Sequence, residues 1–213
     1  MANIKNYNQN FKGCVGNIDS LVDCPLHYDR VAIVCHPNPM FGGTNLNKVS
    51  ATIARTLNQH NFCTIRPNFR GVGKSEGEHT EGVGETEDIL LLIDQVIKAY
   101  PSYHPITLCG FSFGAFVMSR VIQTLQANKT PIEFMILAGV ALGLFDCGLV
   151  CGRPLVIHGE KDDVIPMDRV FRWAELQDHP VVIVPGADHF FSKKLHILKR
   201  VISRFIAKKA KKL

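Results

Sequence analysis

The chain of 213 residues is long enough for one domain that buries most of a central sheet. Hydrophobic residues make up 46% of it and charged residues 20%, which is typical of a soluble globular protein. No apolar run approaches the roughly 18 residues that a membrane span needs, and the polar first ten residues lack the apolar stretch of a signal peptide. We therefore expect a single domain over residues 1–213, with no membrane span and a cytoplasmic location.

The net charge of +5 is concentrated near the C-terminus. From Lys193 onward there are nine Lys or Arg and no Asp or Glu, so the preceding residues hold 15 basic against 19 acidic residues. This pattern indicates a basic C-terminal feature and not a groove running through the protein. Residues 208–213 are expected to form a frayed, solubilising tail without a nucleic-acid partner. Contact with nucleic acid or an anionic membrane is the alternative.

Short apolar runs alternate with helix-length segments from residue 31 onward. The first thirty residues are less periodic and predict an antiparallel edge hairpin, around Phe11–Val15 and Ile18–Val22. The later runs are rich in Val, Ile and Phe and bounded by Gly, Pro or Asn, which is typical of buried parallel strands. They are Val31–Cys35, Phe62–Arg66, Ile106–Cys109, Phe134–Ala138, Leu155–His158 and Val181–Val184.

Between these strands, apolar residues recur three or four positions apart, as on one face of a helix. Four such stripes run from Leu46 to Leu57, from Ile89 to Val96, from Val117 to Leu125 and from Leu195 to Phe205. The alternation predicts an α/β fold, with a mostly parallel sheet and helices on both faces. Only about sixteen residues separate the strand that ends at Ala138 from the one that begins at Leu155, too few for a cap domain.

The pentapeptide Gly-Phe-Ser-Phe-Gly at 110–114 stands between a predicted strand and a predicted helix. It has the G-x-S-x-G form of a nucleophile elbow, a turn so tight that the serine takes strained backbone angles. The flanking glycines let neighbouring backbone pass without a Cβ clash. The turn presents the Ser112 oxygen at the carboxyl edge of the sheet, at a helix N-terminus that favours negative charge. We predict Ser112 as the nucleophile.

Two later loops supply the partners of a serine nucleophile, in the chain order Ser, Asp, His. The segment 158–166 (HGEKDDVIP) begins at the end of a strand, and a carboxylate in it can accept the imidazole Nδ1–H and stabilise the imidazolium. The segment 185–190 (PGADHF) follows the last strand and brings His189 to the same edge of the sheet. We predict His189 as the general base that takes the Ser112 proton and returns it to the leaving group.

Acyl transfer also needs two backbone N–H groups that stabilise the oxyanion. Phe113 directly follows the nucleophile and is expected to supply one of them. The second is expected from the loop after the first parallel strand, His36-Pro37-Asn38-Pro39. Because the two prolines have no N–H, we predict Asn38 as the second donor, in a loop that the prolines stiffen.

Taken together, these motifs make nearly all of residues 18–206 resemble the small, uncapped bacterial α/β-hydrolases, which are related to dienelactone-hydrolase-like and acyl-peptidase-like serine hydrolases. The His36-Pro-Asn-Pro loop, the Asn68–Ser75 loop, the elbow and Asp188-His189 stand in family order. The resemblance implies the α/β-hydrolase fold, ester hydrolysis, and an acid three residues after the glycine of the H-G loop. That residue is Asp162, with Asp163 as the fallback.

One stretch departs from the family pattern. Val140–Arg153 is hydrophobic and contains cysteines where relatives are often more polar, so the specificity of the acyl pocket does not follow from the resemblance.

Several other patterns receive a non-catalytic interpretation. Gly71–Ser75 resembles the end of a phosphate-binding loop, but Asn68 stands where that motif requires Gly, so we predict a tight loop. His36 is expected to pack and hydrogen-bond beneath the oxyanion loop. His179, in a polar context, is expected at a solvated position.

The seven cysteines do not suggest a metal site. Cys35, Cys63 and Cys109 lie in apolar strand-like runs and are expected as reduced, buried thiols. Cys147 and Cys151 have no second pair at zinc-ligand spacing and are interpreted as incidental thiols.

These inferences point to a serine hydrolase that cleaves carboxylic esters or thioesters through an acyl-serine intermediate. Ser112, His189 and Asp162 would be catalytic, Asn38 and Phe113 would form the oxyanion hole, and no cofactor or metal is expected. The partner would be a small-molecule ester. One alternative is amide hydrolysis of the aminopeptidase or acyl-peptidase type, and another is a non-catalytic binding protein on a hydrolase scaffold.

Overall fold

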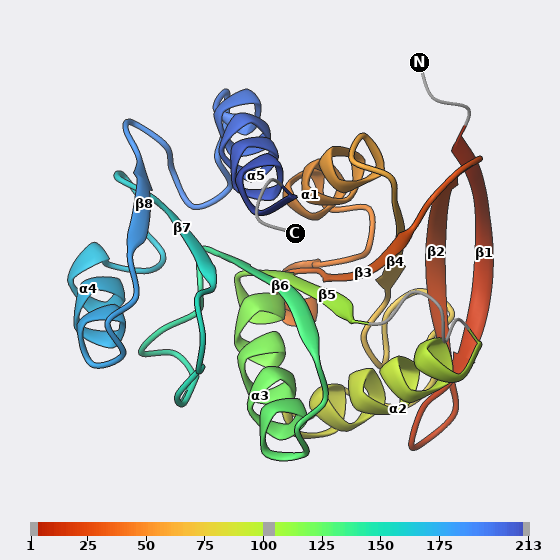
Figure 1. The fold of residues 1–213 in the computed structure, drawn as a ribbon. Helices are drawn as coiled ribbons and strands as arrows, with labels where there is room; N and C mark the ends of the chain where they lie inside the picture. The colour runs from red at the N-terminus through yellow and green to blue at the C-terminus, as the bar shows by residue number, and fades with distance from the viewer. Residues whose placement is uncertain (1–3, 100–104, 211–213) are drawn as a thin grey trace.

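A single eight-stranded sheet forms the centre of the computed structural model, which describes residues 4–99 and 105–210 (Figure 1). The order of strands across the sheet is β1-β2-β4-β3-β5-β6-β7-β8. The pairs β1–β2 and β2–β4 are antiparallel, and the pairs from β4–β3 to β7–β8 are parallel, which confirms the predicted mostly parallel sheet. The strands are β1 (Ile4–Lys12), β2 (Asn17–Pro25), β3 (Arg30–Cys35), β4 (Phe62–Pro67), β5 (Ile106–Phe111), β6 (Ile132–Ala138), β7 (Leu155–Gly159) and β8 (Val181–Val184).

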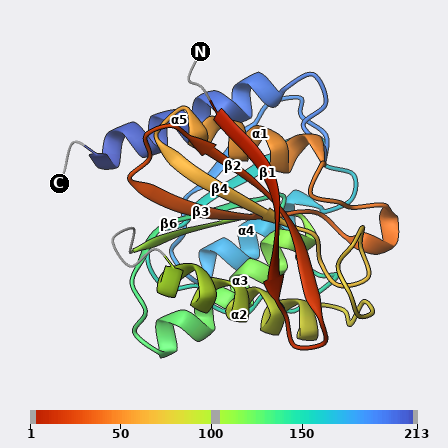
Figure 2. The ribbon, with the colours of Figure 1, turned by 90° about the vertical axis from the view of Figure 1, so that its right-hand side faces the viewer.

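Helices cover both faces of the sheet, as predicted (Figures 1 and 2). α1 (Lys48–Asn58) and α5 (Leu195–Ala210) lie side by side on one face. α2 (Val83–Ala99), α3 (Phe113–Ala127) and α4 (Met167–Glu175) lie on the other. A short 3-10 helix, η1 (Pro39–Phe41), follows β3. Within the described residues, no helix is both long and apolar enough to cross a membrane.

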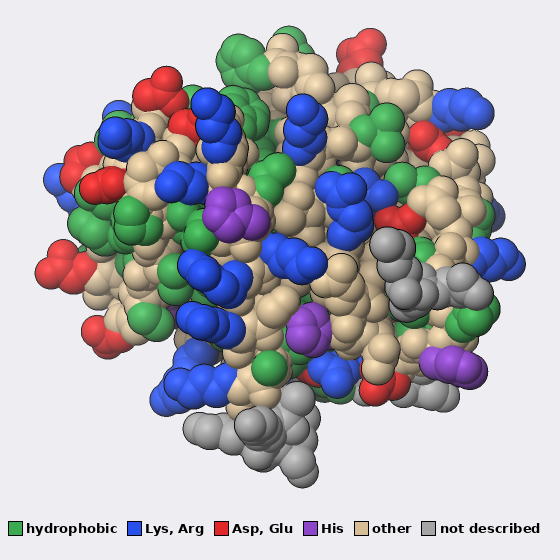
Figure 3. Space-filling view, turned by 90° about the horizontal axis from the view of Figure 1, so that it is seen from above, with side chains coloured by type: hydrophobic (Ala, Val, Ile, Leu, Met, Phe, Trp, Pro, Cys, Tyr) green, Lys and Arg blue, Asp and Glu red, His purple; other side chains and the backbone are tan. Residues whose placement is uncertain are grey.

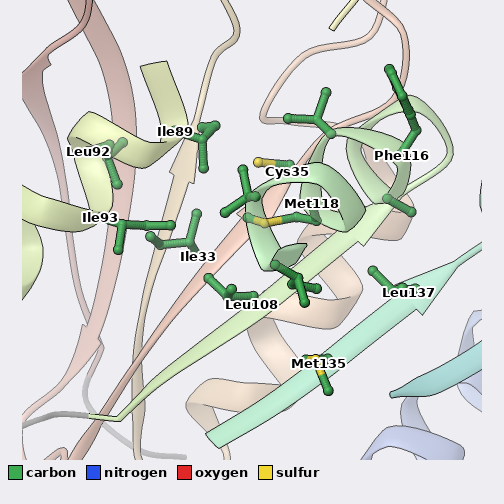
Figure 4. Close-up of a cluster of buried hydrophobic side chains, with 14 of the residues drawn as sticks. Ile33, Cys35, Ile89, Leu92, Ile93, Leu108, Phe116, Met118, Met135 and Leu137 are labelled. Carbon is green, nitrogen blue, oxygen red and sulfur yellow. The ribbon is translucent and has the colours of Figure 1, made fainter. Parts of the chain in front are cut away.

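Alternate residues of the central strands contribute to two separate hydrophobic cores. In β3, Ile33 and Cys35 pack with α2 and α3, while Ala32 and Val34 pack with α1 and α5. Figure 4 shows the first of these cores, in which side chains of α2 and α3 meet those of the central strands. Because the central strands are buried on both faces, their sequences read as continuous apolar runs.

The N-terminal hairpin lies at one edge of the sheet, with strands longer than the predicted stretches. β1 pairs with β2 along its whole length, and Gly13 to Gly16 form the turn, closed by a 2.7 Å bond from the Gly13 N–H to the Gly16 carbonyl. A buried ion pair joins the hairpin to β4, with Arg66 Nη2 2.7 Å from Asp23 Oδ2. The sheet edge is thus fastened by polar contacts as well as by strand pairing.

The expectation that Cys63 is a reduced thiol is wrong in this structure. β2 lies antiparallel to β4, so Cys24 faces Cys63 with 4.2 Å between their Cα atoms, and the two form a disulfide. This pairing joins residues 39 apart and depends on strand register, which the cysteine spacing alone does not reveal. Cys35 and Cys109 are buried free thiols, as predicted.

Three helical features differ from the sequence prediction. α1 begins at Lys48 with Asn47 as its N-cap, so Leu46 lies outside the helix and is 70% exposed. α4 has no counterpart among the predicted stripes because this short helix buries only Val170 and Ala174. α5 continues to Ala210, so the predicted frayed tail is helical over its first residues, and residues 211–213 lie outside the described part of the chain.

Candidate active site

Ser112 occupies the sharp turn between β5 and α3, as the motif predicts. Its backbone angles, φ 55° and ψ −120°, lie in a region that residues with a side chain rarely adopt. Flanking contacts hold this strain: the Ser112 N–H donates to the Ala138 carbonyl of β6 at 2.9 Å, and the Ser112 carbonyl accepts from Ala115 at 2.9 Å. The backbone of Ser112 is therefore held in this conformation at the carboxyl edge of the sheet.

The two glycines of the elbow are required by close packing. A Cβ on Gly110 would lie 2.3 Å from the Gly114 carbonyl oxygen, and one on Gly114 would lie 2.5 Å from the His36 carbonyl oxygen. Both contacts are with backbone, which cannot move aside easily. The absence of these side chains lets the first turn of α3 approach the end of β3, next to the loop that contains Asn38.

His189 and Asp162 meet Ser112 at this edge of the sheet. His189 Nε2 lies 2.9 Å from Ser112 Oγ, and His189 Nδ1 lies 2.8 Å from Asp162 Oδ2. The three residues come from the turn after β5, the loop after β7 and the loop after β8. All three side chains are largely buried: Ser112 is 8% exposed, His189 is 3% exposed and the Asp162 side chain is 1% exposed. Asp163, the fallback, is exposed and does not contact the imidazole in the structure.

Asp162 is fixed by contacts at both of its carboxylate oxygens. Oδ2 faces His189, while Oδ1 accepts the N–H groups of Val164 at 3.0 Å and Ile165 at 2.8 Å. Burial alone would raise the pKa of Asp162, but the hydrogen bonds from His189 and Ile165 outweigh it and leave the pKa below its usual value. The carboxylate is therefore ionised at neutral pH and accepts a hydrogen bond from His189 Nδ1–H, which leaves Nε2 free to accept a hydrogen bond from Ser112 Oγ.

His158 supports the Asp162 loop, a role that the sequence interpretation did not assign. The residue is fully buried, and its Nε2 lies 3.0 Å from the Ile165 carbonyl oxygen, which ties the end of β7 to the far side of the loop. Its Nε2 is also 3.7 Å from Asp162 Oδ2. Burial lowers the pKa of His158, so it is a neutral support and not a second cation beside Asp162. In the sequence, the only indication of this supporting role is the position of His158 at the start of the 158–166 segment.

The two predicted oxyanion donors line the same pocket as Ser112 and His189. Among the described residues, neither the Phe113 N–H nor the Asn38 N–H has a hydrogen-bond acceptor. Both oxygens of Asn38 are engaged: its side-chain Oδ1 accepts from the Met40 N–H at 2.9 Å, and its carbonyl accepts from the Gly43 N–H at 3.0 Å. The loop is therefore rigid, with one unused donor at the pocket.

His36 holds this loop from beneath, as the sequence predicts. Its Nδ1–H donates to the Pro37 carbonyl at 2.7 Å, and its Nε2 accepts the N–H of Phe69 at 3.0 Å. Because the residue is fully buried, desolvation lowers the pKa of His36 to about 4. His36 is thus neutral at physiological pH and joins the Asn38 loop to the loop after β4.

Beside Ser112 opens a pocket of about 340 Å³ with a largely apolar lining. Phe113, Ala141, Leu144 and Phe145 form part of its wall, and Phe41 lies at its rim, 89% exposed. None of the residues that line this pocket is an Asp, Glu, Lys or Arg. The pocket therefore suits an uncharged, apolar group.

The segment between β6 and β7, whose contribution the sequence left open, forms one wall of this pocket. It is held in place by polar side chains of α3 and α4: Gln123 donates to the Cys147 carbonyl at 3.1 Å, and Trp173 donates to the Gly148 carbonyl at 3.0 Å. His179 lies 2.7 Å from the Val150 carbonyl oxygen and is buried, so its predicted solvated position is wrong. These contacts fix the wall, and the described residues form no cap over the site.

The remaining motifs have structural roles. The loop at 71–75 is a tight turn in which Ser75 Oγ donates to the Asn68 carbonyl at 2.8 Å and accepts the Asp19 N–H of the hairpin at 2.9 Å. Cys147 and Cys151 are both free thiols. Within the part of the chain that the structure describes, His, Cys, Asp and Glu side chains form no group of three that could hold a metal ion.

Comparison with known proteins extends these observations. A family model described as serine aminopeptidase, S33, matches residues 41–146, which include the elbow and end before Asp162 and His189. An uncharacterised protein of Rickettsia prowazekii (strain Madrid E) is 29% identical over 192 residues, which cover 83% of this chain and 78% of the relative.

Two solved structures match over almost the whole fold. An α/β serine hydrolase without a lid from Xanthomonas campestris is 31% identical, with a TM-score of 0.88 over 96% of this chain and 94% of that one. An α/β serine hydrolase homologue from Coxiella burnetii is 32% identical, with a TM-score of 0.82 over 96% of this chain and 97% of that one. The likeness therefore extends well beyond the elbow motif.

Proposed function

This chain belongs to the α/β serine hydrolases without a lid, and we propose that it hydrolyses carboxylic esters or thioesters through an acyl intermediate on Ser112. In this proposal Ser112 is the nucleophile, His189 the general base and acid, and Asp162 the residue that orients the imidazole. The N–H groups of Asn38 and Phe113 stabilise the oxyanion. The reaction needs only water as co-reactant.

Each step follows from a contact at the site. Ser112 Oγ attacks the acyl carbon while its proton moves to His189 Nε2, 2.9 Å away. The bond from the acyl carbon to the leaving oxygen or sulfur then breaks, and His189 delivers the proton to that atom. Water repeats the sequence on the acyl-serine: it loses a proton to His189, attacks the acyl carbon, and releases the acid and free Ser112.

The observation that carries this proposal is the hydrogen-bonded chain from Ser112 Oγ through His189 to Asp162, at 2.9 and 2.8 Å, at the mouth of an apolar pocket. A protein that only bound a partner would have no need for an imidazole aligned with a strained, buried serine. The two N–H groups without acceptors at the same pocket add a third component of the machinery.

The lining of the pocket favours an ester over an amino-terminal peptide. An aminopeptidase must hold the ammonium group of its substrate, which requires a carboxylate at the binding site. The described lining contains no Asp or Glu, and Asp162 is already engaged by His189 and backbone N–H groups. An uncharged acyl group fits this pocket without leaving a buried charge unpaired.

The first test is Ser112→Ala. We expect this variant to lose labelling by a fluorophosphonate probe and all measurable hydrolysis of p-nitrophenyl esters, while its melting temperature stays close to that of the wild type. Ser203→Ala, a serine on α5 far along the chain from the elbow, is the matched control and should label normally. Normal labelling of Ser112→Ala would place the nucleophile elsewhere.

Substrate class is tested in parallel with p-nitrophenyl esters of graded chain length and aminoacyl p-nitroanilides. We expect a measurable kcat/KM on the esters and little or none on the anilides. The reverse order would favour the aminopeptidase alternative, to which the description of the matching family model points.

A further inference from the structure

A second pocket, of about 580 Å³, adjoins the active-site pocket. The two share Asn47 and Phe190 as lining residues, so they lie next to each other at this edge of the sheet. We call the second one the lysine pocket, because Lys48 and Lys193 line it. The proposed mechanism uses neither lysine.

The lysine pocket has the chemistry of an anion site. Lys48 begins α1, and Lys193 lies in the loop that follows His189; both are exposed. Neither lysine forms an ion pair within residues 4–99 and 105–210, and no Asp or Glu is among the lining residues. Thr44 and Ser192 add hydroxyl groups. Two ammonium groups with hydroxyl donors beside them suit a phosphate or a similar anion.

The carboxylate in the same loop, Asp188, forms no ion pair with Lys48 or Lys193 among the described residues. Asp188 Oδ1 accepts the Ser192 N–H at 2.7 Å, so it shapes the turn that carries His189 and Lys193. The hydrogen bonds from the backbone and side chain of Ser192 outweigh the effect of burial and lower the pKa of Asp188. Asp188 is not among the residues that line the lysine pocket.

The surface around the lysine pocket is also basic, and the C-terminal charge supplies most of it. The fold places α5 beside α1, and these two helices together carry seven Lys or Arg and no Asp or Glu. Figure 3 shows Lys and Arg side chains spread over this face. A further hollow between the helices, lined by Arg55, His196 and Lys199, continues the positive surface away from the site. Such a field attracts anionic ligands.

The geometry of acyl transfer decides which part of the substrate meets the lysines. His189 must give its proton to the leaving atom, so the leaving group lies on the His189 side of Ser112. The residues that follow His189 (Phe190, Ser192 and Lys193) line the lysine pocket. The apolar wall of the active-site pocket, from the segment after β6, remains for the acyl group.

We infer that the substrate is an ester or thioester of an apolar acid with an alcohol or thiol that carries a phosphate, and that Lys48 and Lys193 bind this phosphate. The inference rests on the proposed ester hydrolysis and specifies its substrate. The chemistry stays balanced: water and the phosphorylated ester give the free acid and the phosphorylated alcohol or thiol. The phosphate is bound but not transferred.

The experiment compares two soluble esters that differ only by a phosphate, 1-hexanoylglycerol and 1-hexanoylglycerol 3-phosphate. For the wild type at low ionic strength, we expect kcat/KM to be about tenfold higher for the phosphorylated ester. In Lys48→Gln/Lys193→Gln this ratio should fall to near one. Added salt should lower the wild-type ratio, because the lysines are exposed to solvent.

The matched control is Arg200→Gln/Arg204→Gln. It removes two positive charges from α5 at exposed positions that do not line the lysine pocket, and it should keep most of the preference for the phosphorylated ester. Each result is the ratio of two kcat/KM values measured on the same preparation of one variant. A partial loss of folded protein lowers both values equally and leaves their ratio unchanged. Melting temperatures close to the wild-type value in both double variants would confirm that the fold is intact.

Two outcomes would overturn the inference and leave the proposed function standing. The first is a wild-type ratio near one, with both esters hydrolysed. The second is an equal fall of the ratio in the two double variants, because the preference would then come from long-range attraction to the basic face, as in docking to an anionic membrane. Failure to hydrolyse either ester, together with absent labelling of Ser112, would count against the proposed function itself.

Discussion

Asp162 contributes to the site through two separate sets of contacts. One oxygen orients His189, and the other accepts two backbone N–H groups of its own loop. The second set holds the carboxylate in place independently of the imidazole. It also helps to keep the pKa of Asp162 low, which the proposed mechanism requires if Asp162 is to stay ionised when His189 takes the proton from Ser112.

We predict that Asp162→Asn lowers kcat by up to ~10⁴-fold, because an amide in this position stabilises the wrong imidazole tautomer. The neighbouring Asp163→Asn serves as the control, since Asp163 is exposed and lies outside this hydrogen-bonded chain. Steady-state kinetics on one p-nitrophenyl ester would measure both. If Asp163→Asn caused the larger loss, the orienting role would belong to Asp163.

His36 makes the stability of the fold depend on pH. Its pKa is about 4 in the folded protein and 6.5 as the ordinary value, so below pH 6.5 the unfolded chain binds the extra proton first. The contribution of His36 to stability is therefore complete above pH 6.5 and is lost as the pH falls towards 4. His158 acts in the same direction, because burial lowers its pKa as well.

We predict that the free energy of unfolding in urea falls by about 2 kcal/mol from His36 alone between pH 7.5 and pH 5. In His36→Gln this fall should be smaller by that amount. A direct check on the wild type is the NMR titration of the His36 ring protons, which requires no variant that folds poorly. A His36 pKa near 6.5 in the folded protein would contradict the prediction.

At the scale of elements, the parallel part of the sheet was the most predictable. Each strand from β3 to β8 begins and ends within two residues of its predicted bounds, because burial on both faces leaves a continuous apolar run in the sequence. The α/β-hydrolase fold is confirmed by the likeness to lidless serine hydrolases. Ser112, Asp162 and His189 could be assigned because each follows the end of such a strand.

Features that depend on register or on local polar contacts could not be predicted. Cys24 meets Cys63 only because β2 pairs antiparallel with β4 in one register. The stripe that includes Leu46 overestimates α1, because the Asn47 side chain caps the helix by accepting two N–H groups. α4 was not predicted because it buries only two side chains, so its sequence shows little helical periodicity of apolar residues.

The segment between β6 and β7 should set the length of acyl chain that the active-site pocket accepts. Phe145 lines the pocket and stacks on Phe116, with 4.6 Å between ring centroids. We predict that Phe145→Ala moves the maximum of kcat/KM to longer p-nitrophenyl esters, since each extra buried methylene contributes roughly 0.8 kcal/mol. The cost in stability should be about 1–3 kcal/mol.

Leu149→Ala is the control for this prediction. Leu149 lies in the same segment, is 64% exposed and does not line the pocket, so its removal should leave the chain-length profile unchanged. An unchanged profile in Phe145→Ala would mean that the acyl chain lies along another wall.

Over the whole molecule, the helices on the two faces of the sheet carry opposite charge. α2 has four acidic residues and one lysine, whereas α1 and α5 have only basic ones. Lys208, Lys209, Lys211 and Lys212 follow Ile206 in the sequence, and among the side chains of α5 that the structure describes, Ile206 is the last that is buried. Their contribution to the surface potential is therefore separable from the contribution of α5 to the core.

We predict that deletion of residues 208–213 leaves the melting temperature and the hydrolysis of an uncharged ester nearly unchanged. The deletion removes the last residues of α5 and none of the described side chains of the hydrophobic core. Deletion of residues 195–213 should instead unfold the protein, because Leu198, Ile202 and Ile206 are each at most 1% exposed. Each contributes roughly 1.5–3 kcal/mol, and together they approach the ~5–15 kcal/mol that stabilises a whole domain.

Thermal unfolding followed by circular dichroism would separate the two deletions. A large loss of stability in the shorter one would assign the tail a packing role that its position beyond Ile206 does not suggest.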